Sequence, residues 1–261
     1  MKKLLFTFLM MHCFVYAQSQ TIMRYNYIGK LVVDKTQPEE ITESIFILDV
    51  NAANSSRFLE KDLLERKNAL SKVISKEEAM QIISTYRPQT DFAVFHTNGT
   101  LTTNTMIHKT TYSYNDDKKT FVWQIEPGHE QWHTYTVQKA TTFFEGRQWH
   151  VLFTSEIPII EGPYKFKNLP GFVVKAWDDE KQYEFEFLNS EKVTIDNWDL
   201  SNPKEIVTSI TPAQYEKALK IYHGKTYRDL LIEMNPENAS IVSPEFAEKI
   251  GLRSNPIYKV Q

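Results

Sequence analysis

The fold is decided by residues 135–177, YTVQKATTFFEGRQWHVLFTSEIPIIEGPYKFKNLPGFVVKAW. Apolar and polar residues alternate on both sides of residue 146, and Tyr135, Val137 and Phe143 fall on one face of the first segment, as in a half-buried β-strand. Between the two segments, Glu145-Gly146-Arg147 predicts a hairpin turn, because glycine adopts positive φ without strain. Prolines then interrupt the pairing before a further strand from Gly171. The stretch therefore predicts an antiparallel sheet.

Similar alternation predicts further strands on both sides of this stretch. They are expected at residues 21–33, 44–50, 91–97, 101–114, 120–126, 183–188 and 193–198. In one of them, Tyr183, Phe185 and Phe187 face one way while the intervening glutamates face the other. Short connections with turn residues favour antiparallel pairing, and the first two strands are expected to form a hairpin.

A 3.6-residue apolar period predicts helices between and after the strands. We expect them at residues 55–73, 75–87, 211–224 and 243–251. Ser75 with Glu78 forms a capping box, and Thr211-Pro212 is a cap with proline at the first helical position. Helices and strands are segregated along the chain, so the fold class is α+β. We expect one curved antiparallel sheet, a half-barrel resembling periplasmic lipoprotein carriers, with helices packed on one side.

The first 17 residues have the three parts of a secretory signal peptide: two lysines, an apolar run and small residues before a cleavage site after Ala17. Cleavage leaves one domain, residues 18–261, and removes Cys13, which is the one cysteine. No disulfide or thiolate metal site is therefore expected. Loss of Lys2 and Lys3 lowers the 30 basic residues to 28 against 33 acidic ones, a formal charge of −5, which gives no reason to expect nucleic acid as a partner. No later apolar run reaches transmembrane length, so no transmembrane segment is expected in the mature chain.

One short string matches a zinc-peptidase pattern. His129-Glu130-Gln131-Trp132-His133 is an H-E-x-x-H string, in which a helix brings two imidazoles together as zinc ligands and the glutamate acts as general base. Here the string lies between Pro127-Gly128 and a predicted strand, where no helix of several turns fits. We therefore interpret it as a connection between strands, with no metal or other cofactor. A zinc site at His129 and His133, with Glu130 as base, is the alternative.

Cationic side chains flank the central strands. Lys139, Arg147 and Lys165, together with Trp149, are the candidate binding residues, because such cations hold a carboxylate or a lipid headgroup. The alternative is cross-strand ion pairing with Glu145 or Glu156. The sequence offers no catalytic residues with a recognisable motif.

Several short segments resemble the GLPGLI family of secreted proteins from Gram-negative bacteria. The family's motif stands here as residues 168–173, NLPGFV, and similar segments are Gly146-Arg147, Glu156-Ile157-Pro158, residues 162–166 (GPYKF) and Asn255-Pro256-Ile257. The resemblance implies secretion and brings no mechanism with it. From the residues themselves, we interpret Gly162-Pro163 and Leu169-Pro170-Gly171 as a structural crossing that seats Phe166 and Leu169 in the apolar interior.

These observations predict a non-enzymatic binding or accessory protein. The chain has 13 tyrosines, 16 phenylalanines and 5 tryptophans, enough to line an apolar cavity for a lipid, an acyl chain or a peptide. The expected location is the periplasm or the periphery of the outer membrane, and an outer-membrane receptor is a possible partner that the resemblance implies. The alternative is a zinc-dependent hydrolase built on the H-E-x-x-H string.

Overall fold

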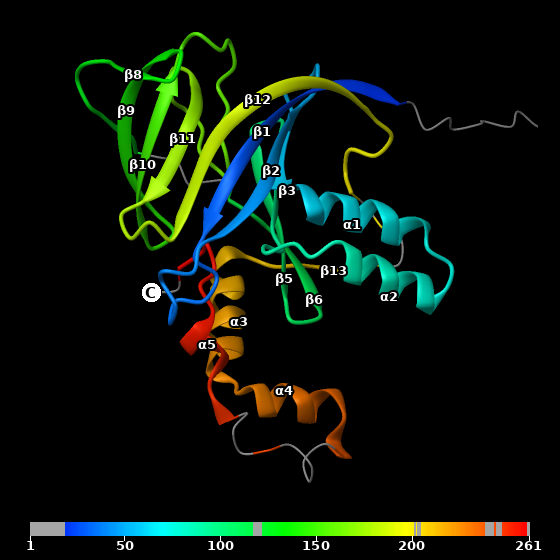
Figure 1. Ribbon diagram of the computed structural model, residues 1–261. Helices are drawn as coiled ribbons and strands as arrows, with labels where there is room; N and C mark the ends of the chain where they lie inside the picture. Colours follow the sequence, from blue (N-terminus) through cyan, green and yellow to red (C-terminus); the bar gives the residue numbers. More distant parts are fainter. Residues whose placement is uncertain are drawn as a thin grey trace, which may run out of the picture.

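The computed structural model describes residues 19–116, 122–200, 202, 205–237, 243 and 247–259. Over these residues the fold is α+β, with a large, mostly antiparallel, unclosed sheet of 13 strands and five helices (Figure 1). The expected signal peptide and Cys13 lie outside the described residues. So do parts of the strand predicted at 120–126 and of the helix predicted at 243–251.

The sheet is one continuous surface in which β1 is central. The strands are β1 (Gln20–Leu31), β2 (Thr42–Val50), β3 (Ser56–Glu60), β4 (Ala93–Thr97), β5 (Thr100–Ile107), β6 (Thr110–Asn115), β7 (Gln124–Ile125), β8 (Glu130–Trp132), β9 (Tyr135–Phe144), β10 (Arg147–Thr154), β11 (Phe172–Asp178), β12 (Tyr183–Ile195) and β13 (Val207–Ser209). Their order is β13-β6-β5-β4-β3-β2-β1-β12-β11-β10-β9-β7, and β8 also pairs with β9. β13 runs parallel to β6, and the other pairs of described strands are antiparallel.

Among the five described helices, the first packs against β2 and β3, and the third packs against β5 and β6. The helices are α1 (Lys61–Lys72), α2 (Lys76–Thr85), α3 (Pro212–Gly224), α4 (Tyr227–Met234) and α5 (Ile250–Arg253). Leu63 and Leu64 of α1 pack on Ile47 and Leu59, whereas Tyr215 and Leu219 of α3 pack on Ile107 and Tyr114. Among the described residues, no helix is long and apolar enough to cross a membrane.

The inner face of the curved sheet carries a packed aromatic core. Phe46 and Phe58 stack with their ring centroids 5.4 Å apart, and Phe185 meets Phe46 edge to face at 5.1 Å. Phe166 and Leu169 are 0% and 1% exposed, and Phe166 meets Trp149 at 4.8 Å. The crossing between β10 and β11 therefore seats both residues in the interior, as the sequence predicts.

Three strand predictions are confirmed in detail. β1 and β2 form the expected hairpin, and Glu145 and Gly146 have φ values of 50° and 77° in the predicted turn between β9 and β10. On β12, Tyr183, Phe185 and Phe187 are buried while the glutamates between them are half-buried. The strand also continues to Ile195, so the two strands predicted at 183–188 and 193–198 are one.

Other element predictions are wrong. Residues 56–60 are strand β3 and not the start of the predicted helix, because Phe58 packs in the aromatic core and Leu59 on the opposite face with α1. The strand predicted at 101–114 is divided into β5 and β6 by a turn at His108, whose φ is 56°. On β9, Val137 is buried as predicted, but Phe143, which the pattern places on the same face, is 62% exposed, and Phe144 is buried instead. Strands β8 and β13 and helix α4 have no counterpart in the prediction, and α5 continues beyond the predicted end at Gly251.

Candidate functional site

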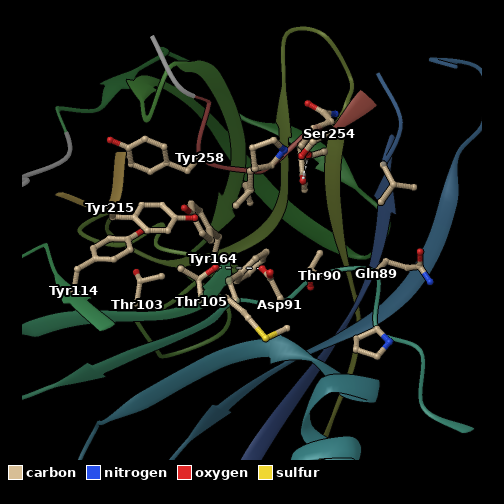
Figure 2. Close-up of a pocket in the computed structure, with 18 of the residues that line it drawn as sticks. Gln89, Thr90, Asp91, Thr103, Thr105, Tyr114, Tyr164, Tyr215, Ser254 and Tyr258 are labelled. Carbon is tan, nitrogen blue, oxygen red and sulfur yellow. Dashed lines mark hydrogen bonds between the residues drawn. The ribbon is translucent and has the colours of Figure 1, made fainter. Parts of the chain in front are cut away.

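A cavity of about 370 Å³ opens between the strands β5 and β6, the loop before β4 and the C-terminal segment (Figure 2). Thr103 and Thr105 are alternate residues of β5 and therefore face the cavity together. The loop at residues 88–92 forms a second wall, and residues 254–258, which follow α5, form a third. Figure 2 shows Gln89 and Thr90 on one side of the cavity and the labelled tyrosines on the other.

Tyrosines from five different parts of the chain line the cavity. They are Tyr114 of β6, Tyr164 of the crossing segment, Tyr183 of β12, Tyr215 of α3 and Tyr258 near the C-terminus. Tyr114 and Tyr215 stack with centroids 4.8 Å apart, and Tyr215 meets Tyr258 edge to face at 5.6 Å. Burial raises the pKa of Tyr114, Tyr164 and Tyr215 well above the ordinary value, so their hydroxyl groups stay protonated and able to donate.

Asp91 supplies the acidic group of the cavity. Thr105 Oγ1 donates to Asp91 Oδ1 at 3.2 Å. Surrounding protein atoms raise the pKa of the Asp91 carboxyl to about 6 by desolvation, and the hydrogen bond from Thr105 opposes this rise. Asp91 nevertheless remains accessible to solvent, because it faces the open cavity. A carboxyl with a shifted pKa in a cleft is a candidate functional group.

Glu60 fixes the loop that carries Asp91. Its buried carboxylate accepts hydrogen bonds from Gln89 N, Thr90 N and Thr90 Oγ1 at 2.8–3.0 Å. Because the charged acceptor satisfies two consecutive backbone donors, the loop is held in one conformation beside β4. Asp91 is thus positioned by strand β3, which ends at Glu60.

A buried ionic cluster supports the tyrosine wall. The ammonium group of Lys165 lies 2.6 Å from Asp116 Oδ2 and 2.7 Å from Glu145 Oε1. Tyr164 donates from its hydroxyl to the other carboxylate oxygen of Glu145. Burial alone would lower the pKa of Lys165, but the two carboxylates more than offset this effect and raise it. Lys165 is therefore an internal cation that holds the cavity wall in place.

Arg147 holds the C-terminal wall of the cavity. Its guanidinium is 2.7 Å from Asp178 Oδ2 and donates to Asn255 Oδ1 at 2.9 Å. It also donates to the carbonyl oxygens of Pro256 at 2.9 Å and Ile257 at 3.0 Å. Five donors in a planar fork suit this combination of acceptors. The C-terminal segment is therefore tied to the β9–β10 hairpin.

The structure separates the four predicted binding residues. Lys139 lies on β9, partly exposed and 3.3 Å from Glu126, whereas Arg147, Trp149 and Lys165 are buried. The predicted alternative of pairing with Glu145 is confirmed for Lys165, while the Glu156 carboxylate accepts from Thr136 N instead. A role for the four residues in ligand binding stays a prediction.

The glycine and proline segments have structural roles at close contacts. A Cβ atom built at Gly162 would lie 2.7 Å from Val173 Cβ, and one at Gly171 would lie 2.3 Å from Thr154 O. At Gly146, where φ is positive, it would lie 2.5 Å from Lys259 O. Pro163 and Pro170 border this crossing, and the Pro163 carbonyl accepts from Phe166 N at 3.2 Å.

The H-E-x-x-H string does not form the arrangement that zinc peptidases need. Glu130 begins strand β8, which pairs with β9, and His133 follows the strand with a φ of 51°. The string is therefore extended and not helical, as its context predicts, and His129 and His133 are not brought together by a helical turn. Among the described residues, no group of three or more His, Cys, Asp or Glu side chains has a geometry that would hold a metal ion.

Asp91 and the lining tyrosines were not identified from the sequence as site residues. Asp91 appears only as the start of a predicted strand, and the tyrosines are spread over residues 114–258. The one available signal is the similarity of Asn255-Pro256-Ile257 to a family segment, since these residues line the cavity.

Comparisons with known proteins support the fold. No family model matches the chain, and no curated protein matches it. Two solved structures of PNGF-II are similar, one in the P21 space group with 12% identity and a TM-score of 0.52, and one in the C2 space group with 13% identity and a TM-score of 0.51. They cover 80% and 77% of this chain, which itself spans only 37% and 33% of the PNGF-II chains. At this identity the likeness shows the fold alone.

A third solved structure is more distant. It is an uncharacterized conserved protein from Thermus thermophilus, with 8% identity and a TM-score of 0.36 over 74% of this chain and 91% of that chain. The likeness carries no argument about function.

Proposed function

We propose that the protein is a non-enzymatic binding protein of the periplasm or the outer-membrane periphery, and that the cavity at Asp91 binds a short peptide. The observation that carries the proposal is the solvent-accessible Asp91 carboxyl in a cavity lined by tyrosine and threonine hydroxyls. The location rests on the N-terminal sequence and the family resemblance.

The chemistry of the lining favours a peptide over an acyl chain. Arg66 and Asp91 supply one cation and one anion, which complement the carboxylate and the ammonium of a peptide with free termini. Hydroxyl groups of Thr103, Thr105 and Tyr258 can pair with peptide amides, and aromatic faces can pack on small side chains. An acyl chain would displace water from the accessible Asp91 carboxyl without offering it a hydrogen-bond donor, which disfavours its binding. The volume lies within the range of small-ligand sites.

Isothermal titration calorimetry with trialanine, with its blocked form (N-acetylated and C-amidated) and with palmitate tests the proposal. We expect trialanine to bind, and Asp91→Asn to weaken its binding by about tenfold or more, because the peptide ammonium loses a charged acceptor. The matched control is Glu77→Gln, which removes one negative charge from an exposed position on α2 and should leave the affinity unchanged.

The other two probes decide between ligand classes. If the blocked peptide binds as tightly as trialanine, the pairing of termini with Asp91 and Arg66 is excluded. If palmitate binds and trialanine does not, the site is a lipid site and the peptide proposal fails.

A further inference from the structure

The cluster around Lys165 has an unusual combination of charge and burial. The side chains of Lys165, Asp116 and Glu145 are all 0% exposed, so one ammonium and two carboxylates share an enclosed space. Rings of Tyr114, Phe144 and Tyr164 lie 4.9–5.7 Å from the Lys165 ammonium. Paired charges are seldom buried so completely, because desolvation costs several kcal/mol per ion. The cavity function does not use this cluster beyond its support of Tyr114 and Tyr164.

We propose that Lys165 and Asp116 condense to form an intramolecular isopeptide bond. The Lys165 Nζ atom lies 2.6 Å from Asp116 Oδ2, which is one covalent bond from the Cγ atom that it would attack. The amine is thus in direct contact with the carboxyl group that it would attack, and the reaction requires an Nζ to Cγ separation of about 3–3.5 Å. The product is an amide between the two side chains, and it needs no cofactor.

Glu145 is positioned to transfer the protons of this reaction. One proton passes from the Lys165 ammonium to the Glu145 carboxylate, 2.7 Å away, and leaves a neutral amine. The amine nitrogen attacks Asp116 Cγ, a bond from Cγ to oxygen breaks, and the oxygen departs as water with that proton and a second one from nitrogen. An ammonium and a carboxylate thus become an amide and one water molecule, and Glu145 is regenerated.

The surroundings favour the condensed product. In a space closed to solvent, the reaction removes one cation and one anion, and with them the cost of keeping both desolvated. The Tyr164 hydroxyl donates to Glu145 and holds the carboxylate in place. The raised pKa of Lys165 means that the ammonium is the resting form, so that proton transfer to Glu145 is the first step.

A second buried lysine lacks these features. Lys167 contacts the Glu161 carboxylate, but its side chain is 10% exposed, and it also donates to the hydroxyl of Ser56 at 3.1 Å. Among its described contacts there is no second carboxylate to accept a proton while the first is attacked. Lys167 therefore serves as the matched comparison for Lys165.

The proposed bond would join parts of the sheet that are far apart in strand order. Asp116 follows β6, near one end of the sheet, and Lys165 belongs to the crossing between β10 and β11, near the other end. Residues 18–261 contain no cysteine, so a disulfide cannot make this connection. An isopeptide bond would supply a covalent closure of an otherwise open sheet.

Mass spectrometry of the purified protein tests the proposal. We expect the intact mass to be lower than the sequence mass by one water molecule, once the N-terminal residue is established. A tryptic digest should contain residues 110–118 joined to residues 148–167, because trypsin does not cleave after an acylated Lys165. N-terminal cyclisation of Gln18 is distinguishable, since it loses ammonia and leaves these two peptides separate. Full sequence mass with unlinked peptides would overturn the proposal.

Variants separate the bond from the ion pair. Lys165→Arg keeps the positive charge without a nucleophilic amine. The mass of this variant should therefore equal the mass calculated from its own sequence. Glu145→Gln removes the proton acceptor, so this variant should also have the full mass calculated from its sequence. If its mass is still lower by one water molecule, the role of Glu145 is refuted. The mass of Lys167→Arg should still be lower than its sequence mass by one water molecule. Because each effect is read as a mass, a variant that is less stable still gives an answer.

Discussion

At the scale of single residues, Gly171 occupies a position where the backbone of another strand leaves no room for a side chain. A Cβ atom there would lie 2.3 Å from the carbonyl oxygen of Thr154, at the end of β10. Gly171→Ala should therefore force β10 and β11 apart and lower the free energy of unfolding by about 1–3 kcal/mol, as overpacking does. Urea unfolding monitored by tryptophan fluorescence measures the change.

Gly224 provides the control for this prediction. A Cβ atom at Gly224 meets nothing within 4 Å, and the residue ends helix α3. Gly224→Ala should leave the unfolding midpoint unchanged or raise it slightly, because alanine has the higher helix propensity. Equal midpoints for both variants would show that the crossing at Gly171 relaxes without cost.

The Asp91 carboxyl predicts a pH dependence of stability. Its pKa is about 6 in the folded protein, above the ordinary value of 3.8, so the folded state binds the proton more tightly than the unfolded state. The proton bound to Asp91 therefore stabilises the folded state below about pH 4, and this contribution is lost as the pH rises through 6. Asp91→Asn should therefore gain stability relative to the wild type between pH 4 and pH 7.

Thermal unfolding of both proteins at several pH values measures this difference. The gain should be small, because solvent reaches Asp91 through the cavity and screens its charge. A difference that is constant across the pH range would mean that Asp91 does not titrate there.

At the scale of elements, helix α3 depends on a complete capping box. Thr211 Oγ1 accepts from Gln214 N at 3.2 Å, and Gln214 Oε1 accepts from Thr211 N at 2.8 Å. Thr211→Ala should cost about 1 kcal/mol of stability by leaving a helix N–H group without its acceptor. Thr211→Ser keeps the hydroxyl and should restore most of the loss in chemical denaturation. If serine and alanine are equally destabilising, the lost methyl contact and not the cap is responsible.

The sequence could predict those structures that depend on neighbouring residues. The cap at Thr211-Pro212 and the hairpin turn at Glu145-Gly146 depend on neighbouring residues, so local patterns identified them correctly. Residues 56–60 were assigned to a helix because Phe58, Leu59, Leu63 and Leu64 fit an apolar helical stripe. The tertiary structure decides otherwise, since β3 is inserted between β2 and β4 and is buried on both faces.

Local sequence patterns could not predict the candidate site either, because its residues come together only in the tertiary structure. Asp91, Tyr164, Tyr215 and Tyr258 come from a loop, a crossing, a helix and the C-terminal segment. No spacing in the sequence connects them, because their proximity results from the order of strands and from the contacts of Arg147. By contrast, the burial of Phe166 follows from its place between two chain-breaking segments, and the sequence predicted it.

At the scale of the whole molecule, the buried Arg147 joins the hairpin to the C-terminal segment. Arg147→Met would leave Asp178 without its cation and release Asn255 and two carbonyl groups. We expect a loss of about 3–5 kcal/mol, the cost of breaking a buried ion pair on one side. Hydrogen exchange should also become faster at residues 254–258, which form one wall of the cavity.

Lys139→Met is the control for this variant. The pair of Lys139 with Glu126 is partly exposed, so its loss should change stability by no more than about 1 kcal/mol. If Arg147→Met were as mild as Lys139→Met, the C-terminal segment would be held by its packing and not by the guanidinium.

The pairing of β1 with β12 has a consequence for how the chain folds. Gln20 lies opposite Ile195 and Leu31 opposite Tyr183, so the central strand β1 pairs on one side with β12, a strand that is far away in sequence. Loop-closure entropy must be overcome before that contact forms, and topologies with many such contacts fold slowly. Before β12 pairs with β1, the hairpin of β1 and β2 has an unpaired strand edge at Tyr25 and Tyr27. Incomplete chains associate through such edges. A chain interrupted before residue 183 would therefore be prone to aggregate, however well its first strands had paired.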